Sequence, residues 1–328
     1  MSLAQRIETL RASRGFAHKT DIAGVVGALA RALPNGAADL AQAVAVGDDC
    51  AAIADGEGYL LFAIEGLVAD FVEAMPWFAG YSGVMVNISD IYAMGGRPIA
   101  VVDALWSDGL DAARAVLDGM AAASAAYGVP IVGGHSNARA GGAQLAVAIL
   151  GRARRLLSSF AARPGDRLLM AVDLRGRFED PYPFWNASVG APPQRLRADL
   201  ELLPALAEDG LCDAAKDISM AGAIGTALML LEASQVGARI DLDAIPRPDG
   251  VDVDRWLGAF PSFGFLMSVR AAQADAVIAR FAARGLACAA VGTVDATREV
   301  VLTEGGEAAR LWDLRETPFI GAAPGAAR

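Results

Sequence analysis

The sequence predicts an α/β (α+β) protein made of two domains. Its 328 residues are enough for two globular domains, and 54% of them are hydrophobic, which supplies ample core. Strand-like and helix-like patterns alternate in both halves of the chain. A polar, turn-rich stretch at 152–166 separates these halves, so each half is expected to fold around its own sheet.

The first half begins with two helical patterns. Residues 3–13 form the first, which Gly15 is expected to break, and Thr20 or Asp21 can cap a second helix that ends before Pro34-Asn35-Gly36. Further on, the patterns predict strands at 43–46, 59–64, 99–105, 130–133 and 144–150, and helices at 78–94 and 111–127.

The second half repeats the alternation after a strand at 167–172. The expected elements that follow are helices at 196–207, 221–234 and 271–284, strands at 264–269 and 287–294, and a short polar tail. Residues 173–194 have a loop-like composition. There Arg175 and Arg177 could hold an anion and Trp185 could stack on a substrate, and a packing segment is an equally good interpretation.

Charge and composition exclude several classes of protein. The net charge of −10 argues against nonspecific nucleic-acid binding, which needs a cationic face. The N-terminus has no continuous apolar core, and no uncharged stretch is long and apolar enough to cross a bilayer. Cys50, Cys212 and Cys288 are too dispersed for a disulfide framework. We therefore expect a cytoplasmic protein without nucleic-acid or membrane partners.

The familiar phosphate and nucleophile motifs are absent. Gly15 to Thr20 ends in Lys-Thr but lacks the spacing of a Walker A loop, and no GxGxxG, HExxH or GxSxG is present. The chain has only two lysines, Lys19 and Lys216, and two histidines, His18 and His135. A histidine-based metal cluster is therefore nearly excluded.

Acidic and polar turns recur at the expected strand ends and on one helix face. They are Gly47-Asp48-Asp49, Glu65-Gly66, Asn87-Ile-Ser-Asp90 and Asp217-Ile-Ser219. Asn87 and Asp90 are three residues apart and share a helix face. If these groups converge, their oxygens would form a carboxylate-lined magnesium and phosphate site.

Each of these motifs also has a structural interpretation. Asp48-Asp49 could be a solvated turn, Asp217 could cap the helix that follows it, and Gly133-Gly134-His135 could be a turn. Taken separately the signals are weak, and their order along the chain makes them specific.

In that order the motifs resemble those of the aminoimidazole ribonucleotide (AIR) synthase superfamily. That superfamily includes thiamine-monophosphate kinase and selenophosphate synthetase. The resemblance covers roughly residues 40–295 and is most specific in Asn87-Ile-Ser-Asp90-Ile-Tyr-Ala-Met-Gly-Gly-Arg-Pro98. Gly47-Asp48-Asp49-Cys50-Ala51, Ile131-Val-Gly-Gly-His-Ser136 and Lys216-Asp217-Ile-Ser219 match further superfamily turns.

The resemblance implies a fold and a set of site residues. It implies an AIR synthase-like homodimer in which the N-terminal domains pair into a β-barrel and the C-terminal α/β domains lie outside. ATP and Mg2+ would be the cofactors, with a small molecule as second substrate. The implied metal ligands are Asp48, Asp49, Glu65, Asp90 and Asp217. The implied cofactor-binding residues are Gly47, Asn87, Gly133, Gly134, Lys216 and Ser219. The implied catalytic residues are Lys19, Asp48 and His135.

The implied domains are residues 1–36 (helical and flexible), 37–155 (N-terminal domain) and 156–328 (C-terminal domain). In the relatives a flexible N-terminal segment folds over the phosphates, and here Gly15 to Thr20 would bring Lys19 there to neutralise charge. The chain departs from thiamine-monophosphate kinase at Glu65, His135 and Met220, and it lacks the N-terminal cysteine of selenophosphate synthetase.

The expected function is an ATP- and Mg2+-dependent enzyme of the kinase or synthetase type. It would phosphorylate a small molecule or activate an amide or carbonyl oxygen as a phosphate. The alternatives are a thiamine-monophosphate kinase-like or selenophosphate synthetase-like activity, a nucleotide-binding homodimer with little turnover, and a structural dimer without a ligand.

Overall fold

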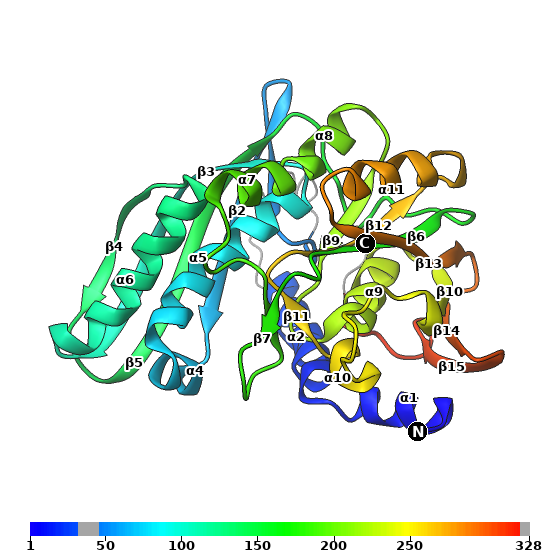
Figure 1. Cartoon of the computed structure of the whole chain (residues 1–328), viewed down its shortest axis with the longest axis horizontal. Coiled ribbons are helices and arrows are strands. Elements are labelled where there is room, and N and C mark those ends of the chain that lie inside the picture. Colours follow the sequence, from blue (N-terminus) through cyan, green and yellow to red (C-terminus); the bar gives the residue numbers. More distant parts are fainter. Residues whose placement is uncertain (32–45, 322–328) are drawn as a thin grey trace. The chain divides into compact units, whose positions relative to one another are not determined.

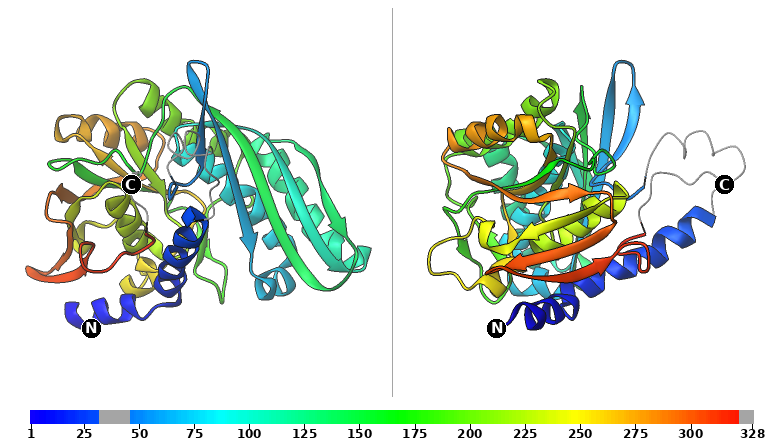
Figure 2. Two further views of the ribbon diagram at one scale, coloured as in Figure 1. Left: turned by 180° about the vertical axis from the view of Figure 1, so that it is seen from behind. Right: turned by 90° about the vertical axis from the view of Figure 1, so that its right-hand side faces the viewer.

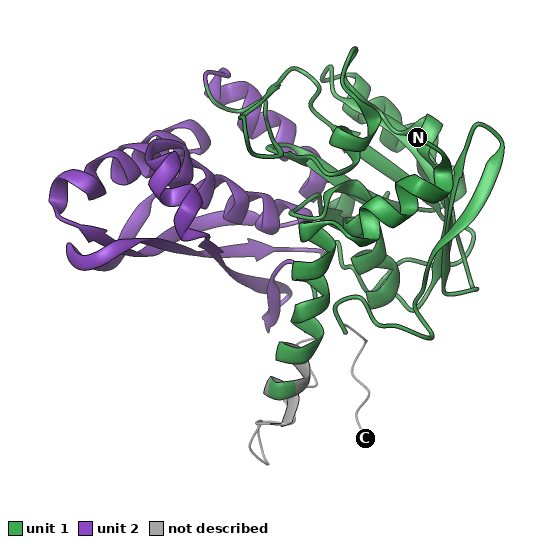
Figure 3. Cartoon of the chain, turned by 90° about the horizontal axis from the view of Figure 1, so that it is seen from below, with its two compact units in different colours: residues 1–48, 156–189, 206–328 green, residues 49–155, 190–205 purple. Residues whose placement is uncertain are grey.

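The computed structural model describes residues 1–31 and 46–321 of the chain. Its contacts divide the chain into two compact units, which are coloured separately in Figure 3. The first unit contains residues 1–48, 156–189 and 206–328, and the second contains residues 49–155 and 190–205. The expected strand at 43–46 and the helix stop at Pro34-Asn35-Gly36 fall wholly or mainly outside the described residues.

The second unit is a five-stranded sheet with helices on one face (Figure 1). Its strand order is β1-β2-β5-β3-β4, with β3 and β4 parallel and the other pairs antiparallel. Its elements are β1 (Ala51–Asp55), β2 (Gly58–Leu67), α4 (Ala69–Ala74), α5 (Pro76–Ala93), β3 (Arg97–Asp108), α6 (Leu110–Tyr127), β4 (Ile131–Asn137), β5 (Arg139–Ala153) and α7 (Pro193–Leu200).

Glycines allow the helices of this unit to approach closely. A Cβ on Gly80 would lie 2.0 Å from the carbonyl oxygen of Val116, and one on Gly119 would lie 1.9 Å from that of Trp77, so α5 and α6 touch backbone to backbone. A Cβ on Gly83 would lie 3.1 Å from Val147, which brings α5 down onto β5. This packing therefore sets the distance between α5 and the sheet.

The first unit is a seven-stranded mixed sheet, ordered β15-β14-β10-β13-β6-β12-β9. Its larger elements are α1 (Leu3–Arg11), α2 (Arg14–Arg31), β6 (Arg167–Val172), β9 (Ala214–Asp217), α9 (Gly222–Ala233), β10 (Gly237–Asp241), β12 (Gly264–Val269), α11 (Ala274–Ala282), β13 (Ala287–Asp295), β14 (Glu299–Glu304) and β15 (Glu307–Asp313). The smaller ones are β7 (Arg177–Phe178), β8 (Phe184–Asn186), η1 (Leu242–Ala244), α10 (Val253–Leu257), β11 (Phe260–Pro261) and η2 (Ala271–Gln273).

Helix α9 is buried along its whole length and packs in one core with α1 and α2. Helix α8 (Leu202–Glu208) begins in the second unit and ends in the first. The sequence predicted one helix over 196–207, but α7 and α8 are separate, and Pro204 falls in the first turn of α8, where it donates no hydrogen bond. The expected polar tail instead contains the hairpin β14–β15.

The mixed α/β class is confirmed, and the described strands form open sheets without a closed barrel. Among the described helices, none has the length and apolarity needed to span a bilayer. The cytoplasmic location stays a prediction.

Candidate functional site

An acidic pair in the second unit forms the centre of the candidate site. Asp49 lies two residues before the start of β1, and Asp90 lies in the last turn of α5. Their carboxylates offer oxygens within 4.8 Å of one another, and Asp90 is only 6% exposed. Two carboxylates at this separation suit a shared divalent cation, since the cation offsets their mutual repulsion.

Asn87 contributes a buried oxygen one turn before Asp90. The side chain is fully buried, and its amide nitrogen donates to the carbonyl oxygen of Gly83 at 2.7 Å. Its Oδ1 atom is buried and makes no hydrogen bond within the described part of the chain. A buried amide oxygen without a donor costs free energy, so this atom is suited to accept a ligand, a water or a cation.

Glu65 lies on the helix-covered side of β2. Side chains an even number of residues apart on a strand share a face, so Glu65 points to the same side as Leu61 and Leu67, which lie near Gly96 and Gly83 respectively. The side chain of Glu65 is exposed. The structure thus places Glu65 on the same side of the sheet as α5. It is not part of the group of closely spaced oxygens, so its role as a ligand stays a prediction.

The structure separates the roles expected for Asp48 and Asp49. Asp48 belongs to the first unit, where its carboxylate accepts hydrogen bonds from Ser158 and Ser159. Gly47, which precedes it, has a φ of 119°, a conformation that favours glycine. The two serines were not expected from the sequence, because Ser158 and Ser159 are more than 100 positions from Asp48 along the chain.

Gly134 leaves space for a neighbouring carboxylate. A Cβ at this position would lie 2.4 Å from Oδ1 of Asp103 and 2.7 Å from its carbonyl oxygen. Burial raises the pKa of Asp103, a residue that lies outside the sequence motifs. The structure therefore gives Gly134 a packing role, whereas Gly133 has open space around it and remains available to a ligand.

We expect Gly134→Ala to lower the free energy of unfolding by about 1–3 kcal/mol, because the new methyl group forces Asp103 and the backbone to move. Gly133→Ala is the matched control, one residue away in β4, and should change stability by less than about 1 kcal/mol. Urea unfolding of both variants measures the difference, and equal values would contradict the packing role.

His135 lies on the opposite face of the sheet from Gly134. It is the neighbour of Ala104 in the register, and its ring lies 6.1 Å from that of Trp106. Val147 faces α5, and the register pairs Val147 with Asp103 and Asp103 with Gly134, so Gly134 faces α5 as well. His135 is the next residue along the strand and therefore points to the face that α5 does not cover. The structure therefore does not bring His135 to the Asp49–Asp90 pair within the unit.

The segment expected to carry Lys19 over the phosphates is helical. Gly15 does not break the helix: α2 begins at Arg14, and a Cβ on Gly15 would lie 2.9 Å from the backbone of Met220 and Ala221. Phe16 is 1% exposed and packs edge-to-face on Phe319 at 5.2 Å. Gly15 thus permits close packing, and Lys19 lies on an ordered helix of the first unit.

Lys216 and Asp217 are consecutive residues of β9, the edge strand of the seven-stranded sheet, and are 4% and 5% exposed. Ser219 follows, and its backbone amide donates to Thr226 Oγ1 at 3.3 Å. Asp217 belongs to the first unit and the acidic pair to the second, so its place in a common metal site stays a prediction.

The loop considered for a second substrate is occupied by internal packing. Arg175 pairs with Asp173 through two hydrogen bonds of 2.7 and 3.0 Å. Trp185 is 5% exposed, donates to the carbonyl oxygen of Asp173, and packs on Phe178. The side chains of Arg175 (37% exposed) and Arg177 (78%) both reach solvent, so the packing interpretation holds for Trp185.

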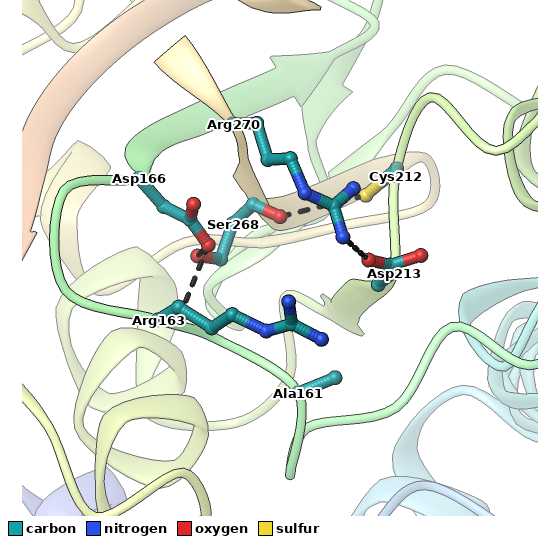
Figure 4. A pocket seen from close by; sticks show the side chains of 7 residues that line it. All are labelled: Ala161, Arg163, Asp166, Cys212, Asp213, Ser268 and Arg270. Atoms are coloured by element: carbon teal, nitrogen blue, oxygen red, sulfur yellow. Dashed lines mark hydrogen bonds and ion pairs between the residues drawn. The ribbon is translucent and has the colours of Figure 1, made fainter.

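A hollow in the first unit lies at the end of the sheet where β6 and β9 begin (Figure 4). Its polar groups are largely satisfied by one another: Ser268 donates to Asp166 at 2.8 Å, and Arg270 pairs with Asp213. Burial raises the pKa of Cys212 to about 12, so this thiol stays protonated and unreactive at neutral pH.

The fold and the acidic pair define a two-unit α/β protein with a candidate site for a hard cation. The sequence model of the AIR synthase related protein, N-terminal domain, matches residues 47–153, and that of the C-terminal domain matches residues 180–304. The chain therefore belongs to the AIR synthase-related proteins, as the motifs indicated.

Similar proteins extend the comparison. An uncharacterized protein of Synechocystis sp. is 51% identical over 281 residues, which are 85% of this chain and 87% of that protein. T. maritima PurL complexed with ATP is 20% identical with a TM-score of 0.70, over 87% of this chain and 48% of that one. AaThiL complexed with AMPPCP and TMP is 19% identical with a TM-score of 0.63, over 80% and 89%. The two structures share the fold, and this chain spans about half the length of PurL.

Proposed function

We propose that this chain is an ATP- and Mg2+-dependent enzyme of the kinase or synthetase type. It would phosphorylate a small molecule, or activate an amide or carbonyl oxygen as a phosphate. The observation that carries the proposal is the Asp49–Asp90 pair, with oxygens within 4.8 Å, together with the buried amide oxygen of Asn87, which lies one turn before Asp90 in α5. Membership of the AIR synthase-related family supports it.

The donor set fits Mg2+. The ion prefers oxygen ligands and is typically held by one or two carboxylates together with substrate phosphates and waters. Asp49 and Asp90 would hold it, and Asn87 would accept a hydrogen bond from a water on it. When bound, Mg2+ supplies positive charge that offsets the phosphates. Glu65 and Asp217 are proposed as further ligands.

The remaining proposed contacts come from the expected set. Gly47, Gly133, Lys216 and Ser219 are proposed to contact the nucleotide, and Lys19 to add positive charge near its phosphates. The names of the similar structures support a nucleotide, since PurL was solved with ATP and with ADP and AaThiL with AMPPCP. Catalysis would then consist mainly of positioning and electrostatic stabilisation.

The proposal is tested by calorimetric titration of the protein with ATP, with and without Mg2+. Magnesium-dependent binding is expected. A screen of small acids, amines and amides for ADP release then identifies the second substrate. No binding under either condition would overturn both the enzyme and the nucleotide-binding alternative.

A second candidate is a nucleotide-binding homodimer with little turnover. The observation that favours it is the helical α2, which holds Lys19 on an ordered helix packed against Met220 and Ala221. A segment held in this way is less able to fold over phosphates. Magnesium-dependent ATP binding without ADP release in the whole screen would support this candidate over the enzyme.

We also propose that the chain is a homodimer formed through the second unit. The face of the five-stranded sheet that lies away from α5 and α6 is uncovered within this unit (Figure 2, left). It presents Phe62 (50% exposed), Ile64 (65%), Val102 (41%) and Leu150 (37%), which are neighbours in the register. A contiguous apolar face of this kind is typical of a protein interface.

Ile64→Arg is expected to raise the dimer dissociation constant at least about 100-fold, because it buries an unpaired charge in the interface. Leu110→Arg is the matched control: Leu110 is 75% exposed on α6, away from this face, and its replacement should leave the dimer intact. Light scattering after gel filtration measures both. A monomeric wild type, or equal dissociation of both variants, would contradict this interface.

A further inference from the structure

Two consecutive serines hold the carboxylate of Asp48. Ser159 donates to Oδ1 from its hydroxyl at 2.6 Å, and to Oδ2 from its backbone amide at 3.0 Å. Ser158 donates to Oδ2 from its hydroxyl at 2.8 Å. Hydrogen bonds to an ionised acceptor are among the stronger ones in proteins, so these three contacts define the orientation of the side chain.

The serines are themselves anchored to the core of the first unit. Ser159 is fully buried, and its carbonyl oxygen accepts from the hydroxyl of Ser234, the residue after α9, at 2.6 Å. That hydroxyl in turn accepts from the amide of Ala162 at 2.9 Å. The amide of Ser158 donates to the carbonyl oxygen of Asp213 at 2.8 Å, beside the hollow drawn in Figure 4. Asp48 is therefore hydrogen-bonded to a turn that is itself anchored within the first unit.

This contact lies at two places where the chain passes between the units. Asp48 is the last residue before the second unit begins at Asp49, and Ser158 and Ser159 lie just after the chain returns at Leu156. A hydrogen-bonded Asp48 therefore ties the two passages together. The residue that it precedes, Asp49, is one of the two closely spaced carboxylates.

The three hydrogen bonds use three of the roughly four acceptor positions of the Asp48 carboxylate, and turning it toward a cation would break them. Both of its oxygens accept hydrogen bonds, and the hydroxyl of the fully buried Ser159 would lose its acceptor. The residue that ties down a ligand-bearing turn typically changes metal affinity without touching the ion.

We propose that Asp48 is a positioning residue: Ser158 and Ser159 lock its carboxylate, and this lock fixes the turn that presents Asp49 to the cation. The inference rests on the proposed function, because Asp49 is a proposed magnesium ligand. It changes the role that the sequence motif gave to Asp48, and it assigns a role to Ser158 and Ser159, which lie outside the motif.

Adjacent amide variants distinguish positioning from coordination. Asp48→Asn keeps a side-chain oxygen that can accept from Ser159 and is expected to bind Mg·ATP within about 10-fold of the wild type. Asp49→Asn removes a ligand charge in the same turn and should weaken binding at least about 100-fold. The double variant Ser158→Ala with Ser159→Ala should weaken it about 10- to 100-fold, although neither serine is a proposed ligand. Isothermal titration measures all three.

Amide hydrogen exchange provides a readout that needs no nucleotide or metal. In the serine double variant, peptides covering residues 46–50 should exchange at least about 10-fold faster than in the wild type, while peptides from α6 stay unchanged. Asp49→Asn should leave the exchange of this turn unchanged. Circular dichroism confirms that the variants are folded.

The outcomes separate the two proposals. Equal, large losses of binding in Asp48→Asn and Asp49→Asn, with wild-type binding in the serine variant, would make Asp48 a ligand and overturn the inference. Unchanged exchange at 46–50 in the serine variant would overturn the lock alone. A wild type that binds no Mg·ATP would overturn the proposed function and the magnesium part of the inference, and exchange would still decide whether the lock exists.

Discussion

Asp90→Asn is expected to bind Mg·ATP at least about 100-fold more weakly than the wild type. Asp90 is one of the two carboxylates whose oxygens lie within 4.8 Å of one another. It is 6% exposed, so little space is left for water to take the place of the lost carboxylate ligand. The amide keeps the shape of the side chain, so the change removes charge and little packing. Titration with ATP at constant free Mg2+ measures the effect.

Asp118→Asn is the matched control for this prediction. Asp118 is an exposed residue of α6 in the same unit, so its variant loses the same charge and should bind Mg·ATP as the wild type does. In EDTA, Asp90→Asn should differ much less from the wild type. A similar weakening in both variants would show that net charge, rather than a cation site, governs binding.

The elements of the second unit could largely be predicted because their signals are local. The helix expected at 78–94 is α5 at Pro76–Ala93, and the one expected at 111–127 is α6 at Leu110–Tyr127. Gly128 ends α6 in a left-handed conformation with a φ of 72°, as a glycine at that position commonly does. Apolar periodicity and a glycine that ends a helix depend only on residues close together in the sequence, and no distant contact alters them here.

Long-range contacts explain the differences in the first unit. A glycine within a weak helical pattern predicts a break, but Gly15 is where α2 meets the backbone of Met220 and Ala221. The sequence does not show which residue more than 200 positions away will approach it. The hydrogen bonds of Asp48 with Ser158 and Ser159 could not be predicted for the same reason. An Asp-Asp turn has the same sequence pattern whether its carboxylates bind a cation or a hydroxyl group.

The candidate site itself was predicted in part. The spacing of Asn87 and Asp90 predicted their common helix face, and the resemblance named Asp49 and Asp90 among the ligands; the structure brings the carboxylate oxygens of Asp49 and Asp90 within 4.8 Å of one another. The side of β4 on which His135 lies could not be predicted, because the register between β3 and β4 shifts between Val101 and Val102. A shift of one residue reverses the faces of all residues that follow it, so the direction of His135 depends on a bulge with no clear sequence signal.

Arg6→Met is expected to lower the free energy of unfolding by about 3 kcal/mol. Arg6 lies in α1 with a side chain only 5% exposed, between Asp254 of α10 and Glu304 of β14. Its Nε donates to Asp254 Oδ1 at 2.5 Å and its Nη1 donates to Glu304. The hydrogen bond with Asp254 raises the pKa of Arg6, because it favours the charged guanidinium. Methionine keeps the apolar stem and leaves two carboxylates without their cation.

Arg280→Met is the matched control, because the Arg280–Asp209 pair has side chains 38% and 52% exposed. Its loss should cost less than about 1 kcal/mol, and that cost should shrink further in salt. Urea unfolding at low and high ionic strength compares the two. If Arg6→Met costs no more than Arg280→Met, then α1 is held by the apolar contacts of Leu3, Ile7 and Leu10, and the buried ion pairs add nothing to its stability.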